Sequence, residues 1–83
     1  MRVVTTAAAP LSVSPIQREV LDRVARSSSA AHREVVRARV LLDAADGLGN
    51  KTIAARHGVT PVTVRARRDA FETEGLTDWG KVK

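Results

Sequence analysis

The sequence contains no cysteine and very few aromatic residues. Among its 83 residues there is no Cys or Tyr, and Phe71 and Trp79 are the only aromatic side chains. Without thiols the chain forms no disulfide and offers a metal no thiolate ligand. No apolar run reaches the roughly 20 residues of a membrane-spanning helix, and the N-terminal stretch is a poor secretory signal. We therefore expect one small, soluble, aliphatic-cored domain of the cytoplasm, without a buried catalytic cleft.

The positive charge is concentrated in one part of the chain. Fourteen Lys and Arg residues against nine Asp and Glu give a net charge of +5. The window from Lys51 to Arg68 holds five cations and no acid, so it equals the net charge of the whole chain. An acid-free window in an otherwise balanced chain favours binding to a polyanion over a merely solvated helix face.

A first helix is expected from Ser14 onward. Ser14 and Gln17 can form a capping box, and Pro15 suits the first helical position. The apolar residues at helical spacing on one face are Ile16, Val20, Leu21 and Val24. Three serines at 27–29 are expected to end this helix and to cap the next one.

The second helix is expected over about 30–46. Gly47 is expected to end it in the left-handed conformation. Asp43 and Asp46 lie at the negative end of the helix dipole, where cations are preferred, so we expect them to pair with Lys51 or an arginine. The broad apolar face of this helix consists of Val35, Val36, Val40, Leu41, Leu42, Ala44 and Ala45.

Residues 50–71 carry the pattern of a helix-turn-helix. Asn50 is expected to cap a short helix, and Gly58 permits the positive φ of a tight corner between crossing helices. Thr60 is expected to cap the following helix, which Pro61 starts. The side chains expected in the shared core are Ile53, Ala54, Val59 and Val64. The sequence thus predicts an all-α fold of three core helices plus an N-terminal capping helix.

A helix-turn-helix lays its second helix in the major groove of DNA, with the first residues of that helix toward the base edges. The residues predicted to face bases are Thr60, Pro61, Val62, Arg65, Ala66 and Asp69. Arg65 is the strongest of them, because arginine can bond both O6 and N7 of guanine. The residues predicted to face phosphates are Asn50, Lys51, Thr52, Arg56, Thr63 and Arg68.

Arg67 falls where an apolar side chain would be expected. It follows Val64 by three residues and precedes Phe71 by four. We expect its aliphatic stem to cover the core and its guanidinium to pair with Asp43 or Asp46 rather than with DNA.

The two ends of the chain are expected to lie outside the domain. Residues 1–13 are interpreted as a mobile leader, 14–76 as the DNA-binding domain, and 77–83 as a tail or the start of a basic linker. Residues 75–76 predict a Schellman end for the last helix. Trp79 is expected to anchor the tail against the helices.

From Leu11 to Trp79 the chain resembles the N-terminal region of bacterial mariner-type insertion-sequence transposases. The resemblance rests on the blocks Arg37–Leu48, Ile53–Ala54, Gly58–Val59, Thr63–Val64, and Phe71 with Glu74–Leu76. It implies a homeodomain-like domain that binds the terminal inverted repeats of the element. In that family a catalytic domain with metal-binding carboxylates follows, and tryptophan commonly stands at the position of Arg67.

Three functions follow from these patterns. The favoured one is DNA-end recognition for a transposase, on double-stranded DNA and associated with the nucleoid. The alternatives are a stand-alone transcriptional regulator and, in another class, a helical oligomerisation module that uses the face of residues 35–45. His32 and His57 have no partners at metal-ligand spacing, so we predict no catalytic site, metal, cofactor or small-molecule ligand.

Overall fold

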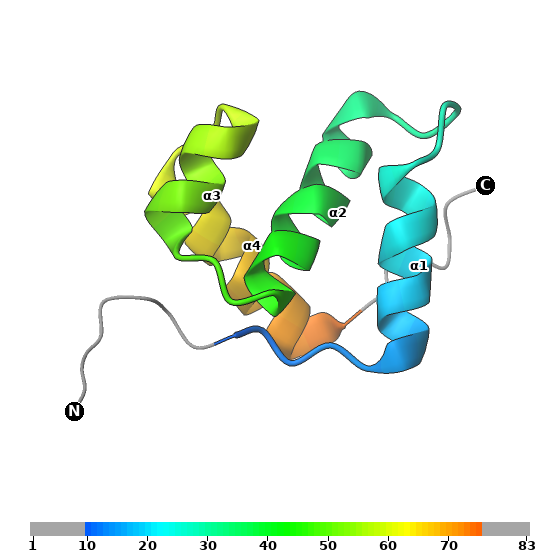
Figure 1. The fold of residues 1–83 in the computed structure, drawn as a ribbon, viewed down its shortest axis with the longest axis horizontal. Helices are drawn as coiled ribbons and strands as arrows, with labels where there is room; N and C mark the ends of the chain where they lie inside the picture. Colours follow the sequence, from blue (N-terminus) through cyan, green and yellow to red (C-terminus); the bar gives the residue numbers. More distant parts are fainter. Residues whose placement is uncertain (1–9, 76–83) are drawn as a thin grey trace.

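Four helices make up the part of the chain that the structure, a computed structural model, describes, residues 10–75. They are α1 (Pro15–Ala25), α2 (His32–Ala45), α3 (Asn50–His57) and α4 (Pro61–Glu74), and residues 10–75 contain no strand. Helix α2 is central: α1 packs along one side of it, and α3 and α4 pack on the other (Figure 1). The all-α prediction of three core helices and an added N-terminal helix is confirmed.

Helix α1 begins as its sequence predicts but presents a different face to the core. Ser14 Oγ accepts the Gln17 N–H at 3.1 Å, and Gln17 Oε1 accepts the Ser14 N–H at 2.9 Å. Leu21 and Ala25 are buried, whereas Ile16 is 74% exposed. Ile16 precedes Leu21 by five residues, which is roughly 140° around a helix, so its expected place on the inner face was wrong.

The packed domain begins before Ser14. Leu11 is only 3% exposed, and its N–H donates to the Ala44 carbonyl at 2.9 Å. The expected mobile leader of residues 1–13 therefore does not extend to Leu11, which belongs to the core. Trp79 and Leu76 lie outside the described residues.

Helix α2 is slightly shorter than expected. The serines do not cap it: Ser27 Oγ accepts the N–H groups of Ser29 and Ala30, and the N-cap is Ala31, without a side-chain bond. At its other end the chain forms the Schellman motif that was expected only at the end of α4. Gly47 has φ +92° there, and the Leu48 N–H donates to the Asp43 carbonyl at 3.1 Å.

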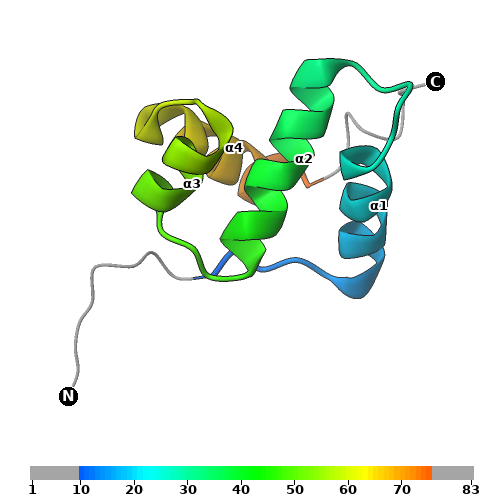
Figure 2. The same ribbon diagram turned by 45° about the horizontal axis from the view of Figure 1, so that its top comes forward.

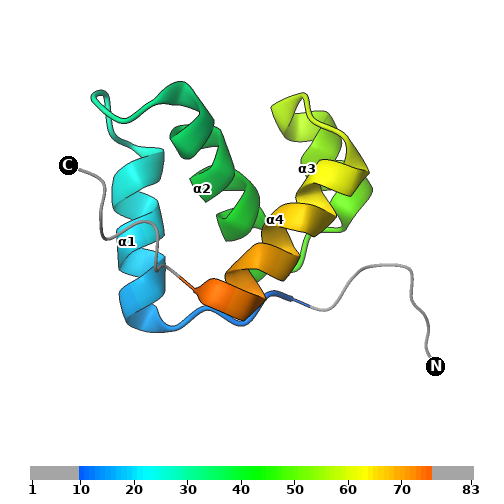
Figure 3. The same cartoon turned by 180° about the vertical axis from the view of Figure 1, so that it is seen from behind.

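The end of α4 has another conformation. Gly75 follows Glu74 with φ +61° and ψ −133°, outside the left-handed helical region that a Schellman motif needs, and its N–H donates to the Phe71 carbonyl. Gly75 lies beside Gln17 of α1. The end of α4 thus meets the start of α1, as Figure 3 shows from behind.

The corner between α3 and α4 matches the predicted helix-turn-helix. Gly58 adopts the left-handed conformation with φ +69°, and the Val59 N–H closes the turn on the Ala54 carbonyl at 3.1 Å. Thr60 Oγ1 accepts the Thr63 N–H at 3.1 Å, and Pro61 is the first residue of α4. The core under this corner holds Ile53, Ala54, Val64 and Phe71, with Val59 packed against them.

Candidate nucleic-acid interface

The outer face of α4 is exposed along its length. Val64, Arg68 and Phe71 are buried, so the helix turns the opposite side to solvent. Val62 is 76% exposed although it is a large apolar residue. The residues predicted to face bases are all exposed: Thr60, Pro61, Val62, Arg65, Ala66 and Asp69. Thr73 is exposed on the same face and was not among the predicted residues. It follows Ala66 by seven residues, or two helical turns, so extending the helical periodicity would have pointed to it.

Two of the threonines near the start of α4 already have partners inside the protein. Thr60 Oγ1 caps the helix and also donates to Thr63 Oγ1 at 3.1 Å. The hydroxyl group of Thr60 is therefore engaged as a helix cap, although Thr60 itself is exposed at the corner.

The start of α3 presents Lys51 and Thr52 to solvent. Asn50 is not the N-cap that its sequence position predicts, because Gly49 takes that place and the helix begins with Asn50. Asn50 Oδ1 is buried and accepts no hydrogen bond from residues 10–75. Gly49 has no side chain that could accept hydrogen bonds from the first N–H groups of α3. These groups, next to Lys51, therefore have no side-chain cap.

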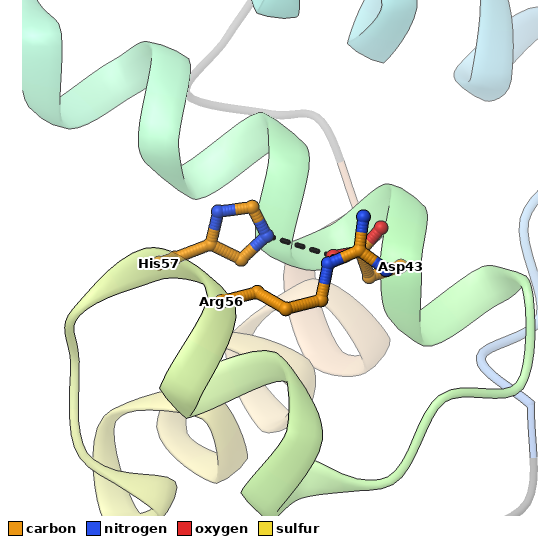
Figure 4. Close-up of polar contacts among 3 residues, drawn as sticks. All are labelled: Asp43, Arg56 and His57. Atoms are coloured by element: carbon orange, nitrogen blue, oxygen red, sulfur yellow. Dashed lines mark hydrogen bonds and ion pairs between the residues drawn. The ribbon is translucent and has the colours of Figure 1, made fainter.

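A carboxylate on α2 contacts the last two residues of α3. Asp43 Oδ2 lies 2.7 Å from His57 Nε2 and 3.7 Å from Arg56 Nε (Figure 4). The side chains of Asp43 and His57 are 16% and 14% exposed, against 56% for Arg56. The expectation that an arginine neutralises Asp43 is confirmed, with His57 as a second partner. Arg56, predicted to face phosphate, keeps more than half of its surface open.

Replacing Asp43 with Asn is expected to destabilise the domain by about 1–2 kcal/mol, because the largely buried His57 and the neighbouring Arg56 lose their charged partner. The matched control is Asp46→Asn. Asp46 pairs with Arg18 at 3.0 Å, but both side chains are 43% or more exposed, so we expect a change within about 0.5 kcal/mol. Urea unfolding followed by circular dichroism measures both. Equal losses in the two variants would contradict the role given to Asp43.

Arg67 and Arg68 exchange the places that the sequence predicts for them. Arg68 is only 9% exposed and packs on the same side as Val64 and Phe71, so it does not offer its guanidinium to a phosphate. Arg67 is exposed, and the acids expected to pair with it, Asp43 and Asp46, pair with other residues. Both arginines lie three or four residues from each apolar neighbour, so spacing alone does not distinguish them.

Residues 10–75 hold no group of three or more His, Asp or Glu side chains placed to bind a metal ion. Among the same residues, no helix combines the length and the apolar character needed to cross a bilayer.

Part of the face expected for oligomerisation is covered inside the domain. Val40, Leu41 and Ala44 of α2 are 2%, 1% and 0% exposed, because the other helices pack against α2. The remaining residues of that face are half-buried, namely Val35, Val36, Leu42 and Ala45.

The part of the chain from α2 onward is similar to a known protein family. A family model described as a homeodomain-like domain matches residues 31–79, more than half of the chain. The match takes in α2, α3 and α4 and leaves α1 outside. No curated protein and no solved structure matches the sequence.

Proposed function

Because this chain belongs to the homeodomain-like domain family, we propose that it binds double-stranded DNA with α4 as the recognition helix in the major groove. The observation that carries the proposal is the two-sided character of α4. Its inner side is fixed by Val64 and Phe71, and its outer side from Val62 to Asp69 is free of packing.

The exposed cations around this face divide into two roles. Arg65 stands beside Ala66 and Asp69 and is proposed to bond the O6 and N7 atoms of a guanine. Lys51 and Arg56 are proposed to bind phosphates, with Thr52 and the uncapped start of α3 beside them. Asn50 and Thr63 are half-buried and add to this set only through their remaining exposed atoms.

Within this function we propose that the domain recognises the DNA ends of a mobile element for a mariner-type transposase. The support is the block pattern from Arg37 to Leu76, which the observed corner at Gly58 and cap at Thr60 fit. A stand-alone transcriptional regulator would use the same surface. The gene sequence downstream of Lys83 decides between them, because a transposase requires a following domain with catalytic carboxylates.

Salt dependence tests the DNA proposal. If Lys51 and Arg56 each neutralise one phosphate, the logarithm of the binding constant should fall against the logarithm of salt with a slope of about −1.8 or steeper. Fluorescence anisotropy on a labelled duplex, from low to physiological salt, measures this slope. Binding that does not respond to salt, or no binding to any duplex, would refute the proposal.

A further inference from the structure

A cleft lined by arginines opens between the start of α2 and the helix-turn-helix corner. A cavity of about 290 Å³ lies there, with Val36, Val40 and Val59 among its lining residues and Arg33 and Arg67 beside them. Figure 2 shows α2 and α3 separating toward the start of α2. A second cavity of about 230 Å³ is lined by Arg33, Glu34, Arg37 and Arg67. We call Arg33, Arg37 and Arg67 the arginine cleft.

The arginine cleft holds more positive charge than the acid within it can neutralise. Glu34 is the acid that lines it, and its carboxylate lies 3.8 Å from Arg37. Arg33 and Arg67 are both exposed, and neither forms an ion pair with any residue in 10–75. Guanidinium groups gathered around one opening repel each other, so an anion placed between them is stabilised.

The start of α2 adds to this positive potential. Ala31 is its N-cap and makes no side-chain hydrogen bond to the helix, which runs for 14 residues. The first N–H groups of such a helix carry about half a unit of positive charge. His32 and Arg33, the first two residues of α2, line the larger cavity, so this charge lies at the edge of the cleft.

The arginine cleft lies along one side of α4, the side that carries Thr63. Arg67 is one turn from Thr63, and both line the larger cavity. Arg65 is two residues, or roughly 200° of helix rotation, away from Arg67, so the two arginines do not lie on the same flank. The major groove is about 12 Å wide and an α-helix with its side chains about 10–12 Å, so a helix in the groove has a sugar-phosphate strand along each flank.

We infer that Arg33, Arg37 and Arg67 bind a backbone phosphate of the DNA on the Thr63 flank of α4, which extends the interface onto α2. This inference rests on the proposed function. Arginine suits the role because its planar group donates two parallel hydrogen bonds to phosphate oxygens. The expected effect on the salt response is one additional neutralised phosphate, which makes the slope of the intact protein about −2.7.

The test compares the full chain with the double variant Arg33→Gln/Arg67→Gln and with Arg23→Gln. Arg23 is an exposed arginine of α1, 69% accessible and 3.5 Å from Glu19, so its replacement tests the loss of a positive charge away from the cleft. We expect the double variant to bind a labelled duplex about tenfold more weakly, with a slope shallower by about 0.9. Arg23→Gln should bind like the intact protein.

The outcomes separate the two proposals. If the intact protein binds no duplex, both fail. If it binds and the double variant keeps its affinity and slope, DNA binding stands and the arginine cleft is overturned. Inorganic phosphate is titrated in parallel, with the Arg33 and Arg67 guanidinium signals followed by NMR. Signals that shift with phosphate but not with the duplex would mark a site for a free anion and would also overturn the inference.

Discussion

Replacing Leu41 with alanine is expected to destabilise the domain by about 2–5 kcal/mol. Leu41 is 1% exposed in the second half of α2, and its side chain belongs to the buried core of the domain. Folded domains have about 0.05–0.15 kcal/mol of stability per residue, so this loss is a large fraction of what a chain of 83 residues holds. Thermal unfolding followed by circular dichroism should show a melting temperature lower by more than about 10 °C.

Ile16→Ala is the control for this experiment. Ile16 is also a large aliphatic residue, but it is 74% exposed, so its truncation should change stability by no more than about 0.5 kcal/mol. The sequence pattern alone placed Ile16 on the inner face of its helix. A loss as large as that of Leu41→Ala would therefore show that α1 packs in the orientation that its sequence suggests and not in the observed one.

Replacing Arg65 with alanine is expected to relax sequence preference at one G·C pair by about 1–3 kcal/mol, or roughly five- to 150-fold. Arg65 is exposed on α4, one helical turn before the exposed Asp69, on the part of the helix proposed to face DNA. Selection of bound duplexes from a random pool, carried out in parallel with the intact protein and the variant, measures this preference directly and does not require a known target sequence.

Lys51→Ala provides the contrast. Lys51 is exposed at the start of α3 and is proposed to bind phosphate, which carries no sequence information. Its loss should weaken all duplexes alike and leave the selected sequence unchanged. If Arg65→Ala behaved in the same way, Arg65 would be a phosphate contact and the register of α4 in the groove would need to be rotated.

Local signals in the sequence predicted the elements that depend on neighbouring residues. The capping box at Ser14, the stop at Gly47, the corner at Gly58 and the cap at Thr60 each need only residues within one helical turn. Because the physics of each is local, residue type and spacing were enough. The end of α3 at His57 was predicted for the same reason, whereas its start lies one residue earlier than predicted, because Gly49 and not Asn50 is the N-cap.

The misplaced residues depend on packing between distant segments. Arg67 and Arg68 both satisfy helical spacing, and which of them is buried depends on how α2 and α3 pack against α4. Leu11 belongs to no periodic pattern, because it joins the core as a single residue. Its N–H donates to the carbonyl of Ala44, which is distant in the sequence. His57 reaches Asp43 only after α3 is folded against α2. For the candidate interface, the sequence pattern thus pointed to the helix that is proposed to enter the groove and gave no signal for the proposed contact at Arg33.

The bond from Leu11 to Ala44 has a consequence for where the smallest autonomously folding fragment begins. The family match starts at residue 31, yet Leu11, Leu21 and Ala25 are buried in the same core as α2. A polypeptide trimmed to the matched segment would uncover one side of α2 to water. The matched segment of three helices is therefore shorter than the unit that buries both sides of α2, because Leu11 and α1 supply the packing on one of these sides.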